Sequence, residues 1–161
     1  MADPQLYELA ERVGQALKAR GLMLATAESC TGGMIAQLLT SIAGSSEWFE
    51  RGLVTYSNRA KVELLGVPQA VIDGHGAVSR ECGEAMALGV LKNAPVQWAI
   101  SVTGIAGPGG GSVDKPVGTV WIGVAHAGAA EARHFLFEGD REGIRRQSAE
   151  AALALLDARL R

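Results

Sequence analysis

The pattern of apolar and polar positions along the chain predicts helices and strands that alternate from the N-terminus onward. Five apolar residues near the start repeat at the spacing of one helix face: Leu6, Leu9, Ala10, Val13 and Leu17. Asp3 and Pro4 are typical of a helix start, and Gly21 is typical of a helix end. The first element is therefore predicted to be an amphipathic helix.

Two strand-then-helix units follow this helix. The apolar run 22–27 predicts a strand, and residues 34–39 carry apolar side chains at helical spacing, which predicts a helix behind it. Residues 52–57 predict a second strand. Asn58 is then expected to cap a short helix that ends before Gly66.

The second half of the chain predicts a loop, a helix, three strands and a last helix. Residues 67–78 are expected to form the loop, and Ser79 to cap a helix that reaches about Asn93. That helix has small residues on its expected buried stripe, which is Cys82, Ala85, Met86 and Gly89. The expected strands are 98–103, 117–125 and 131–137, the last two as an antiparallel hairpin. The last helix, 141–161, has Asp140 as cap and Ile144, Ala151, Leu155 and Leu156 facing inward.

This order predicts the fold class. Strands and helices alternate early and a hairpin comes late, which favours an α/β protein with a single three-layer α/β/α sandwich and a mixed β-sheet. The length of 161 residues suits one domain, 1–161, with a full hydrophobic core.

Charge and hydropathy exclude several classes of partner. The net charge is −2 and the isoelectric point about 5.9, with no basic run longer than Arg145 and Arg146, so nucleic-acid binding is not expected. The apolar runs are far shorter than the roughly 20 residues of a membrane helix. The N-terminal residues lack the pattern of a signal peptide. We therefore expect a cytoplasmic protein without membrane contact.

Cys30 and Cys82 are the only cysteines. Two cysteines do not make a disulfide framework, and without a CxxC pair or a histidine cluster they do not predict a metal site.

Candidate chemistry lies in the segments that follow the strands, because ligands of open α/β sheets bind at the carboxyl ends of the strands. The first such segment, Glu28-Ser29-Cys30-Thr31-Gly32-Gly33, places hydroxyls and a thiol at a helix N-terminus, where free N–H groups can hold an anion or an oxyanion. Ser29 is a candidate nucleophile. The alternative is that Ser29 or Thr31 only caps the helix and the glycines only form a turn. Cys30 is a rival nucleophile, since a thiol at a helix N-terminus has a lowered pKa. The alternative is that Cys30 is a packing residue.

The second segment contains Tyr56, Asn58 and Lys61. Lys61 falls about one turn into the short helix, where it could act as a base. It would have to be neutral, which requires burial or a nearby cation to lower a reference pKa of about 10.4. The alternatives are a solvated surface lysine and, for Tyr56, a core aromatic residue.

The third segment, 103–112, begins with Thr103 and is rich in glycine, including Gly104 and Gly107. Such a backbone can approach a phosphate closely, although a long connection would also use glycine. Arg145 in the last helix could bind a phosphate or carboxylate with two hydrogen bonds, and its alternative is a solvated arginine.

Four blocks of the sequence, taken together, resemble a known family. TAESCTGG, AGSSEWFERGLVTYSNRAK, SVTGIAGPGGG with KPVGTVWIGVA, and FEGDREGIRRQ are similar, in this order, to the CinA carboxy-terminal domain family. Members that stand alone as one domain are nicotinamide-nucleotide amidases. The resemblance implies hydrolysis of the carboxamide of nicotinamide mononucleotide to nicotinic acid mononucleotide and ammonia, in pyridine-nucleotide recycling, with no metal or cofactor.

The resemblance also implies roles for the candidate residues. Ser29 would be the nucleophile and Lys61 its base, with Tyr56 and Thr103 in support. Backbone N–H groups from Cys30 to Gly33 would stabilise the oxyanion, and Gly104 to Gly111 would hold the phosphate with help from Arg145. The resemblance further places four side chains in the site: Glu28, Thr31, Asn58 and Arg145.

Two other functions stay open at this stage. One is a non-catalytic nucleotide-binding or partner-binding module linked to competence or DNA damage, and the other is an amidase for another small amide that uses Cys30. We also expect a homo-oligomer, most simply a dimer, because the last helix is rich in alanine and leucine, although burial within one chain would explain that helix equally well.

Overall fold

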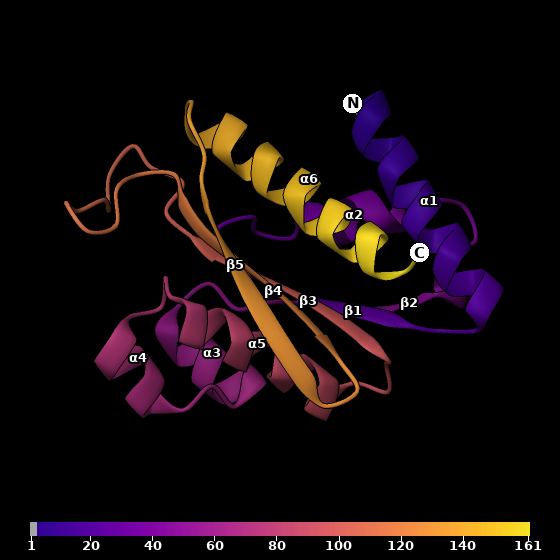
Figure 1. Cartoon of the computed structure of the whole chain (residues 1–161), viewed down its shortest axis with the longest axis horizontal. Coiled ribbons are helices and arrows are strands. Elements are labelled where there is room, and N and C mark those ends of the chain that lie inside the picture. The colour runs from indigo at the N-terminus through magenta and orange to yellow at the C-terminus, as the bar shows by residue number, and fades with distance from the viewer. Residues whose placement is uncertain (1–2) are drawn as a thin grey trace.

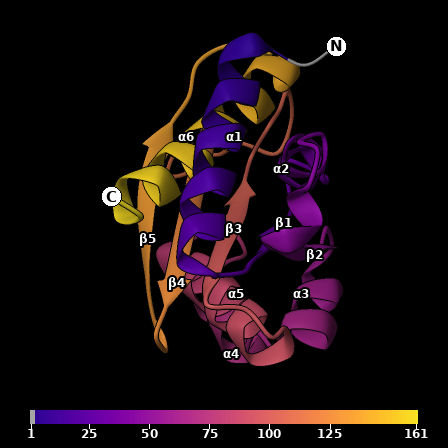
Figure 2. The same ribbon diagram turned by 90° about the vertical axis from the view of Figure 1, so that its right-hand side faces the viewer.

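The computed structural model describes residues 3–161. In chain order its elements are α1 (Pro4–Arg20), β1 (Leu24–Glu28), α2 (Met34–Thr40), the short 3₁₀ helix η1 (Ser45–Glu47), β2 (Phe49–Val54), α3 (Asn58–Leu65), α4 (Gln69–His75), α5 (Arg80–Asn93), β3 (Trp98–Gly104), β4 (Thr119–His126), β5 (Ala129–Leu136) and α6 (Arg141–Arg159). One sheet lies between two layers of helices, with α1, α2 and α6 on one face and α3, α4 and α5 on the other (Figure 1, Figure 2).

The sheet is mixed. Its strand order is β2-β1-β3-β4-β5, with β1 parallel to β2 and β3, and with β4 antiparallel to β3 and β5. The expected α/β/α sandwich with a mixed sheet is therefore confirmed. Because β1, β2 and β3 are parallel, the three segments that follow them meet at one end of the sheet.

The two faces of the sheet are packed differently. The face under α1, α2 and α6 is covered by large side chains such as Leu39 and Leu153. The opposite face carries small residues, and there α5 comes close enough for the Ser101 hydroxyl to donate to the Gly83 carbonyl at 2.6 Å. The predicted small-residue stripe of α5 is thus confirmed, with Ala85 half-buried rather than buried. Close packing of α5 fixes the segment before it against the end of β3.

Caps and turns explain most element boundaries. The Asp3 carboxylate accepts from the Gln5 N–H at 2.8 Å, and Gly21 ends α1 in the left-handed conformation, as predicted. Ser79 and Asp140 cap α5 and α6, also as predicted. The predicted bounds of β1, β3, β4, β5 and α6 agree with the structure to within two residues.

Three sequence predictions are corrected by the structure. The second strand ends at Val54, so residues 55–57 form the connection to α3. Ser57, and not Asn58, caps α3, because its hydroxyl accepts from the Ala60 N–H at 3.0 Å. The expected loop 67–78 contains α4, which forms in spite of its glycine because Ile72 is buried against the second core.

The buried face of the last helix differs slightly from the predicted face. Ile144 and Leu156 are buried as expected, whereas Ala151 and Leu155 are half-buried. The apolar face of α6 therefore packs largely within the chain, against α1 and the sheet. None of the described helices is both long and apolar enough to cross a membrane.

Candidate functional site

The end of the sheet brings Ser29 and Lys61 together. Ser29 directly follows β1, and its N–H is fixed by the Val102 carbonyl of β3 at 3.0 Å. Lys61 stands on the first turn of α3 and is only 1% exposed. Its Nζ lies 3.0 Å from the Ser29 Oγ. The predicted second and first strand-end segments therefore meet through these two side chains.

The surroundings of Lys61 favour a neutral amine. Burial lowers the pKa of Lys61, and within residues 3–161 no carboxylate forms an ion pair with it. Its Nζ also lies 2.9 Å from the Thr55 carbonyl oxygen and 3.0 Å from the Tyr56 carbonyl oxygen. A neutral amine has two N–H groups and one lone pair. The Ser29 hydroxyl also lies 3.4 Å from the Tyr56 carbonyl oxygen. When the amine is neutral and its two N–H groups are on the carbonyls, its lone pair is available to the Ser29 hydroxyl.

The loop that carries Ser29 is held from inside by Glu28. The buried Glu28 carboxyl accepts from the Thr31 hydroxyl at 2.6 Å and from the N–H groups of Ile35 and Ala36 at 2.9 and 3.0 Å. It therefore caps α2, whose own N-cap residue, Gly33, has no side chain to do so. The cap alternative for Ser29 and Thr31 is thus wrong, because the α2 amides bond to Glu28 instead.

Arg145 holds the same loop from the other side. Its Nε donates to the Cys30 carbonyl and its Nη2 to the Thr31 carbonyl, each at 3.1 Å. It also pairs with Glu142 at 3.6 Å. The guanidinium N–H groups of Arg145, which were expected to bind a phosphate or carboxylate, therefore bind two backbone carbonyls. Arg145 does not line the pocket described below.

The backbone amides of the loop divide into two groups. The Gly32 N–H donates to the Ser29 carbonyl at 3.0 Å and so closes a tight turn. Gly32 and Gly33 both have positive φ angles, which only glycine adopts easily. In the part of the chain that the structure describes, the Cys30 and Thr31 N–H groups have no acceptor. Cys30 lines the pocket described below, whereas Thr31 is fully buried and does not.

The Cys30 thiol does not have the low pKa expected at a helix N-terminus. Burial raises the pKa of Cys30 to about 11, and Glu28 adds to the rise. The thiol is therefore protonated near neutral pH, since desolvation outweighs the charges of Arg145 and Lys61.

A pocket of about 190 Å³ opens at Ser29. Eleven residues line it: Ser29, Cys30, Tyr56, Asn58, Lys61, Ala77, Val78, Thr103, Gly104, Ala106 and Arg141. The Thr103 hydroxyl, at the end of β3, donates to the Ala77 carbonyl at 2.9 Å. All three predicted strand-end segments thus contribute to one pocket.

Tyr56 and Asn58 lie at the rim of this pocket. The Tyr56 backbone carbonyl serves Lys61, while its side chain is 63% exposed and its hydroxyl accepts from Arg141 Nη2 at 3.3 Å. Tyr56 is therefore not the core aromatic residue of the alternative interpretation. Asn58 is exposed as the first residue of α3.

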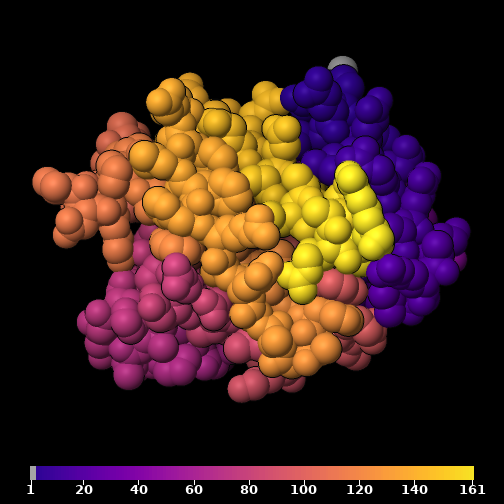
Figure 3. Space-filling model, in the orientation of Figure 1, coloured from indigo at the N-terminus to yellow at the C-terminus, as the bar shows by residue number. Residues whose placement is uncertain are grey.

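The glycine-rich segment after β3 reaches the pocket only in part. Gly104 lines it, whereas Gly107 is not one of the lining residues and its carbonyl accepts from Arg141 Nη1 at 2.6 Å. The rest of the segment projects from the surface (Figure 3). Near its far end, Lys115 donates to the His75 carbonyl at 2.7 Å.

The sequence analysis missed three pocket residues. Arg141 is the first residue of α6 and directly follows the helix cap Asp140. This position, at the end of the sheet where the strand-end segments meet, was the signal that could have identified it. Ala77 and Val78 lay in the segment interpreted as an extended loop, which carried no signal for them.

Comparison with known proteins identifies the family. The sequence pattern of the CinA C-terminal domain matches residues 6–160. The chain belongs to the CinA C-terminal domain family. It is 54% identical over 157 residues to the nicotinamide-nucleotide amidohydrolase PncC of Escherichia coli K12, a match that covers 97% of this chain and 95% of that protein.

Other members of the CinA family extend the comparison. A CinA-like protein of Anaeromyxobacter dehalogenans is 49% identical over 96% of this chain, which corresponds to 38% of that longer protein. The crystal structure of the competence/damage inducible protein CihA from Agrobacterium tumefaciens superposes with a TM-score of 0.95 at 42% identity, covering 98% of this chain and 97% of that one. Within residues 3–161 no group of three or more histidine, cysteine, aspartate or glutamate residues is placed to hold a metal ion.

Proposed function

We propose that this protein is a nicotinamide-nucleotide amidohydrolase, which hydrolyses the carboxamide of nicotinamide mononucleotide to nicotinic acid mononucleotide and ammonia in the cytoplasm. The observation that carries the proposal is the buried Lys61, whose Nζ lies 3.0 Å from the Ser29 hydroxyl inside a pocket. The similarity to PncC over nearly the whole of both chains supports the choice of substrate.

The first step uses the Ser29–Lys61 pair. The Ser29 Oγ attacks the carboxamide carbon, and its proton passes to the lone pair of the Lys61 Nζ. Because the Thr55 and Tyr56 carbonyls hold the other two positions of that nitrogen, Lys61 becomes a cation with three hydrogen bonds at the moment it is protonated. The carbonyls thereby stabilise the charge that the step creates.

The negative charge develops on the former carboxamide oxygen. The free N–H group of Cys30, which lines the pocket, is the donor that we assign to it. The Gly32 N–H, which the sequence analysis included among the donors, already bonds to the Ser29 carbonyl, and so has no part in this role.

Two further steps complete the reaction. The tetrahedral intermediate collapses, its carbon–nitrogen bond breaks, and Lys61 returns the proton to the departing nitrogen, which leaves as ammonia. Lys61 then takes a proton from a water molecule that attacks the Ser29 ester. Breakage of the ester bond releases nicotinic acid mononucleotide, and the proton goes back to the Ser29 oxygen.

The remaining residues of the site support these steps in our proposal. Glu28, Thr31 and Arg145 are positioning residues, because their bonds fix the loop that carries Ser29. Thr103, Gly104 and Asn58 line the pocket with the dyad and would contact the substrate.

The two alternative functions fit the site less well. An amidase that used Cys30 would need a thiolate, whereas burial raises the pKa of Cys30 to about 11. A binding module would gain nothing from burying the Lys61 amine 3.0 Å from a serine hydroxyl, since burial lowers the pKa of Lys61 and so weakens its hold on an anion.

The test is ammonia release from nicotinamide mononucleotide in the presence of a metal chelator. We expect wild type to be active and Ser29→Ala and Lys61→Ala each to lose about 10³-fold or more in kcat. Lys92→Ala, an exposed lysine at the end of α5, is the matched control and should keep full activity. A folded wild-type protein that releases no ammonia would exclude the proposed reaction.

We also propose that the protein is a homodimer. The support is apolar surface along β5, the edge strand of the sheet, where Leu136 is 59% exposed and a groove is lined by Phe135, Phe137 and Leu155. Light scattering after size-exclusion chromatography tests this proposal. A molar mass of one chain, 16.8 kDa, at micromolar concentration would contradict it.

A further inference from the structure

Arg141 is a cation at the rim of a pocket that contains no acidic side chain. Among the described residues that line the pocket, Lys61 and Arg141 are the two that can carry a positive charge, and none is aspartate or glutamate. The three hydrogen-bonding positions of the Lys61 nitrogen are taken by Ser29 and two carbonyls. Arg141 is therefore the side chain that gives this pocket its attraction for an anion.

The contacts of Arg141 hold its guanidinium in place without neutralising it. Nη1 donates to the Gly107 carbonyl at 2.6 Å and Nη2 to the Tyr56 hydroxyl at 3.3 Å. Both acceptors are uncharged, and within residues 3–161 no carboxylate pairs with Arg141. An arginine has five N–H donors, so three remain for a ligand. The Asp140 carboxylate next to it in sequence accepts from the Gly143 N–H instead.

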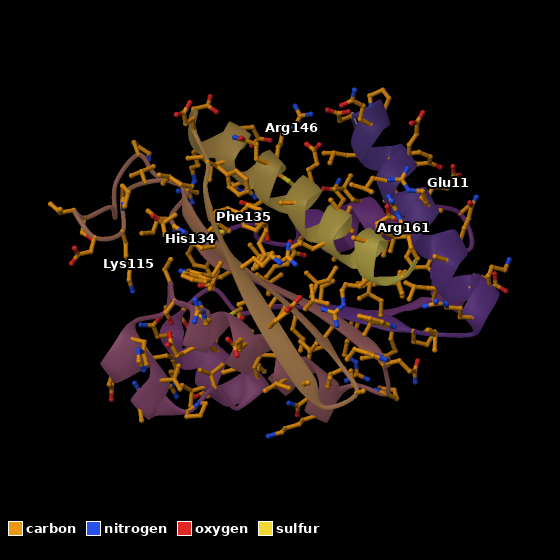
Figure 4. All side chains as sticks on the ribbon, viewed as in Figure 1. Glu11, Lys115, His134, Phe135, Arg146 and Arg161 are labelled. Atoms are coloured by element: carbon orange, nitrogen blue, oxygen red, sulfur yellow. The ribbon has the colours of Figure 1, made fainter. Side chains whose placement is uncertain are left out.

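The other cations near this end of the fold are engaged elsewhere. Arg145 donates to the Cys30 and Thr31 carbonyls. Arg146 pairs with Asp3 on the side of α6 that faces α1 (Figure 4). Lys115 is bound to the His75 carbonyl. Arg141 thus differs from these neighbouring cations in two ways: its exposed guanidinium lines the pocket, and it keeps free N–H donors.

The distance between Arg141 and the dyad suits a substrate with two ends. The Tyr56 carbonyl accepts from Lys61 and the Tyr56 hydroxyl accepts from Arg141, so the two side chains meet opposite ends of one tyrosine residue. The pocket, at about 190 Å³, is smaller than the roughly 300–1,000 Å³ of sites that enclose a whole ligand. It has room for the ring and its carboxamide, while the rest of a nucleotide must lie at the rim beside Arg141.

We propose that Arg141, rather than Arg145, selects the phosphorylated substrate, by binding the 5′-phosphate of the mononucleotide with two hydrogen bonds. The inference rests on the proposed function for the identity of the substrate. A guanidinium matches two phosphate oxygens at once, so the contribution should be that of a charge-assisted pair.

The test measures binding separately from turnover. In a Ser29→Ala background, isothermal titration compares nicotinamide mononucleotide with nicotinamide riboside, which lacks the phosphate. Arg141→Ala should weaken binding of the mononucleotide about 10- to 100-fold and change riboside binding less than about twofold. Arg141→Lys, which keeps the charge without the fork, should give an intermediate loss. Arg146→Ala, an arginine of the same helix outside this pocket, should leave both affinities unchanged.

Three results would overturn the inference: an equal loss for both ligands, an unchanged affinity for the mononucleotide, or no binding of the mononucleotide at all. The ammonia assay separates these from failure of the proposed function. If wild type releases no ammonia but the mononucleotide binds through Arg141, the amidase is wrong and the phosphate site stands. If wild type releases ammonia and Arg141→Ala binds the mononucleotide normally, the amidase stands and the phosphate site at Arg141 is wrong.

Discussion

The Thr31 hydroxyl donates to the buried Glu28 carboxyl at 2.6 Å, across the loop that carries Ser29. The same carboxyl caps α2, so one side chain fixes both the nucleophile loop and the helix behind it. A loop held in this way keeps the Ser29 Oγ and the Cys30 amide in a fixed relation. That relation is what attack and oxyanion binding both require.

Thr31→Val should test this coupling. The variant keeps the shape of the side chain but removes the hydroxyl, which leaves a buried carboxyl oxygen with one partner fewer. We expect the free energy of unfolding to fall by about 1–2 kcal/mol and kcat to fall while KM changes little. Urea denaturation and steady-state kinetics measure the two effects. Thr31→Ser keeps the hydroxyl and should stay near wild type, whereas an unaltered kcat in Thr31→Val would show that the bond does not position Ser29.

The proposed base predicts the pH dependence of activity. Lys61 acts only when neutral, so kcat/KM should rise with pH as Lys61 loses its proton. Because burial lowers the pKa of Lys61, this rise should be centred below the reference value of about 10.4. A pH–rate profile for ammonia release measures it. An acid limb at or above the reference value would be inconsistent with a buried, neutral lysine.

The lowered pKa of Lys61 also predicts how stability changes with pH. Between its folded pKa and about 10.4 the unfolded chain binds the proton and the folded chain does not. Lys61 should therefore contribute a rise in the free energy of unfolding with pH in this window, by up to about 1.4 kcal/mol per pH unit. Lys61→Met removes the titrating group. The two buried cysteines, whose pKa values are raised, contribute a fall with pH in both proteins. The stability of wild type relative to Lys61→Met should therefore rise with pH across the window, and parallel denaturation curves would argue against the shift.

Cys30 should prove to be a packing residue. Since burial raises its pKa to about 11, the native thiol should resist iodoacetamide at pH 8, while the unfolded chain reacts at both cysteines. Cys30→Ala should keep its amidase activity to within a few-fold. Mass spectrometry follows the alkylation. Rapid modification of native Cys30 together with loss of activity would return the cysteine to consideration as nucleophile.

The sequence was informative about the site because parallel strands bring their carboxyl ends together. Ser29 follows β1, Thr103 lies at the end of β3 and Lys61 lies on the first turn of the helix after β2, so a correct sequence of strands was enough to gather them. The sequence left the role of Lys61 open between a base and a surface residue, since a lysine in a short amphipathic helix is usually solvated. Its burial depends on α5 packing over α3, a tertiary contact that no local pattern encodes.

The two arginines of α6 show what local sequence leaves open. Arg141 and Arg145 stand one turn apart, and either could reach an anion. Arg145 instead bonds to the Cys30 and Thr31 carbonyls, because the loop after β1 turns those oxygens toward α6. A guanidinium binds carbonyl and phosphate oxygens through the same N–H groups. Which acceptor each arginine meets is decided by the path of another segment, more than a hundred residues away in the chain.

The glycines of the α5 layer provide the last prediction. A Cβ on Gly89 would lie 2.1 Å from the Leu65 carbonyl oxygen, which belongs to the backbone of α3. Gly89→Ala should therefore push α5 from α3, lower the free energy of unfolding by about 1–3 kcal/mol, and reduce activity by displacing Lys61. Gly74→Ala is the matched control, because this α4 glycine has no atom within 4 Å of an added Cβ. In a helix alanine is favoured over glycine, so Gly74→Ala should stabilise the protein by about 0.5–1 kcal/mol. Thermal denaturation of the two variants compares their stabilities. Equal changes in the free energy of unfolding would mean that α5 can shift away from α3 without cost.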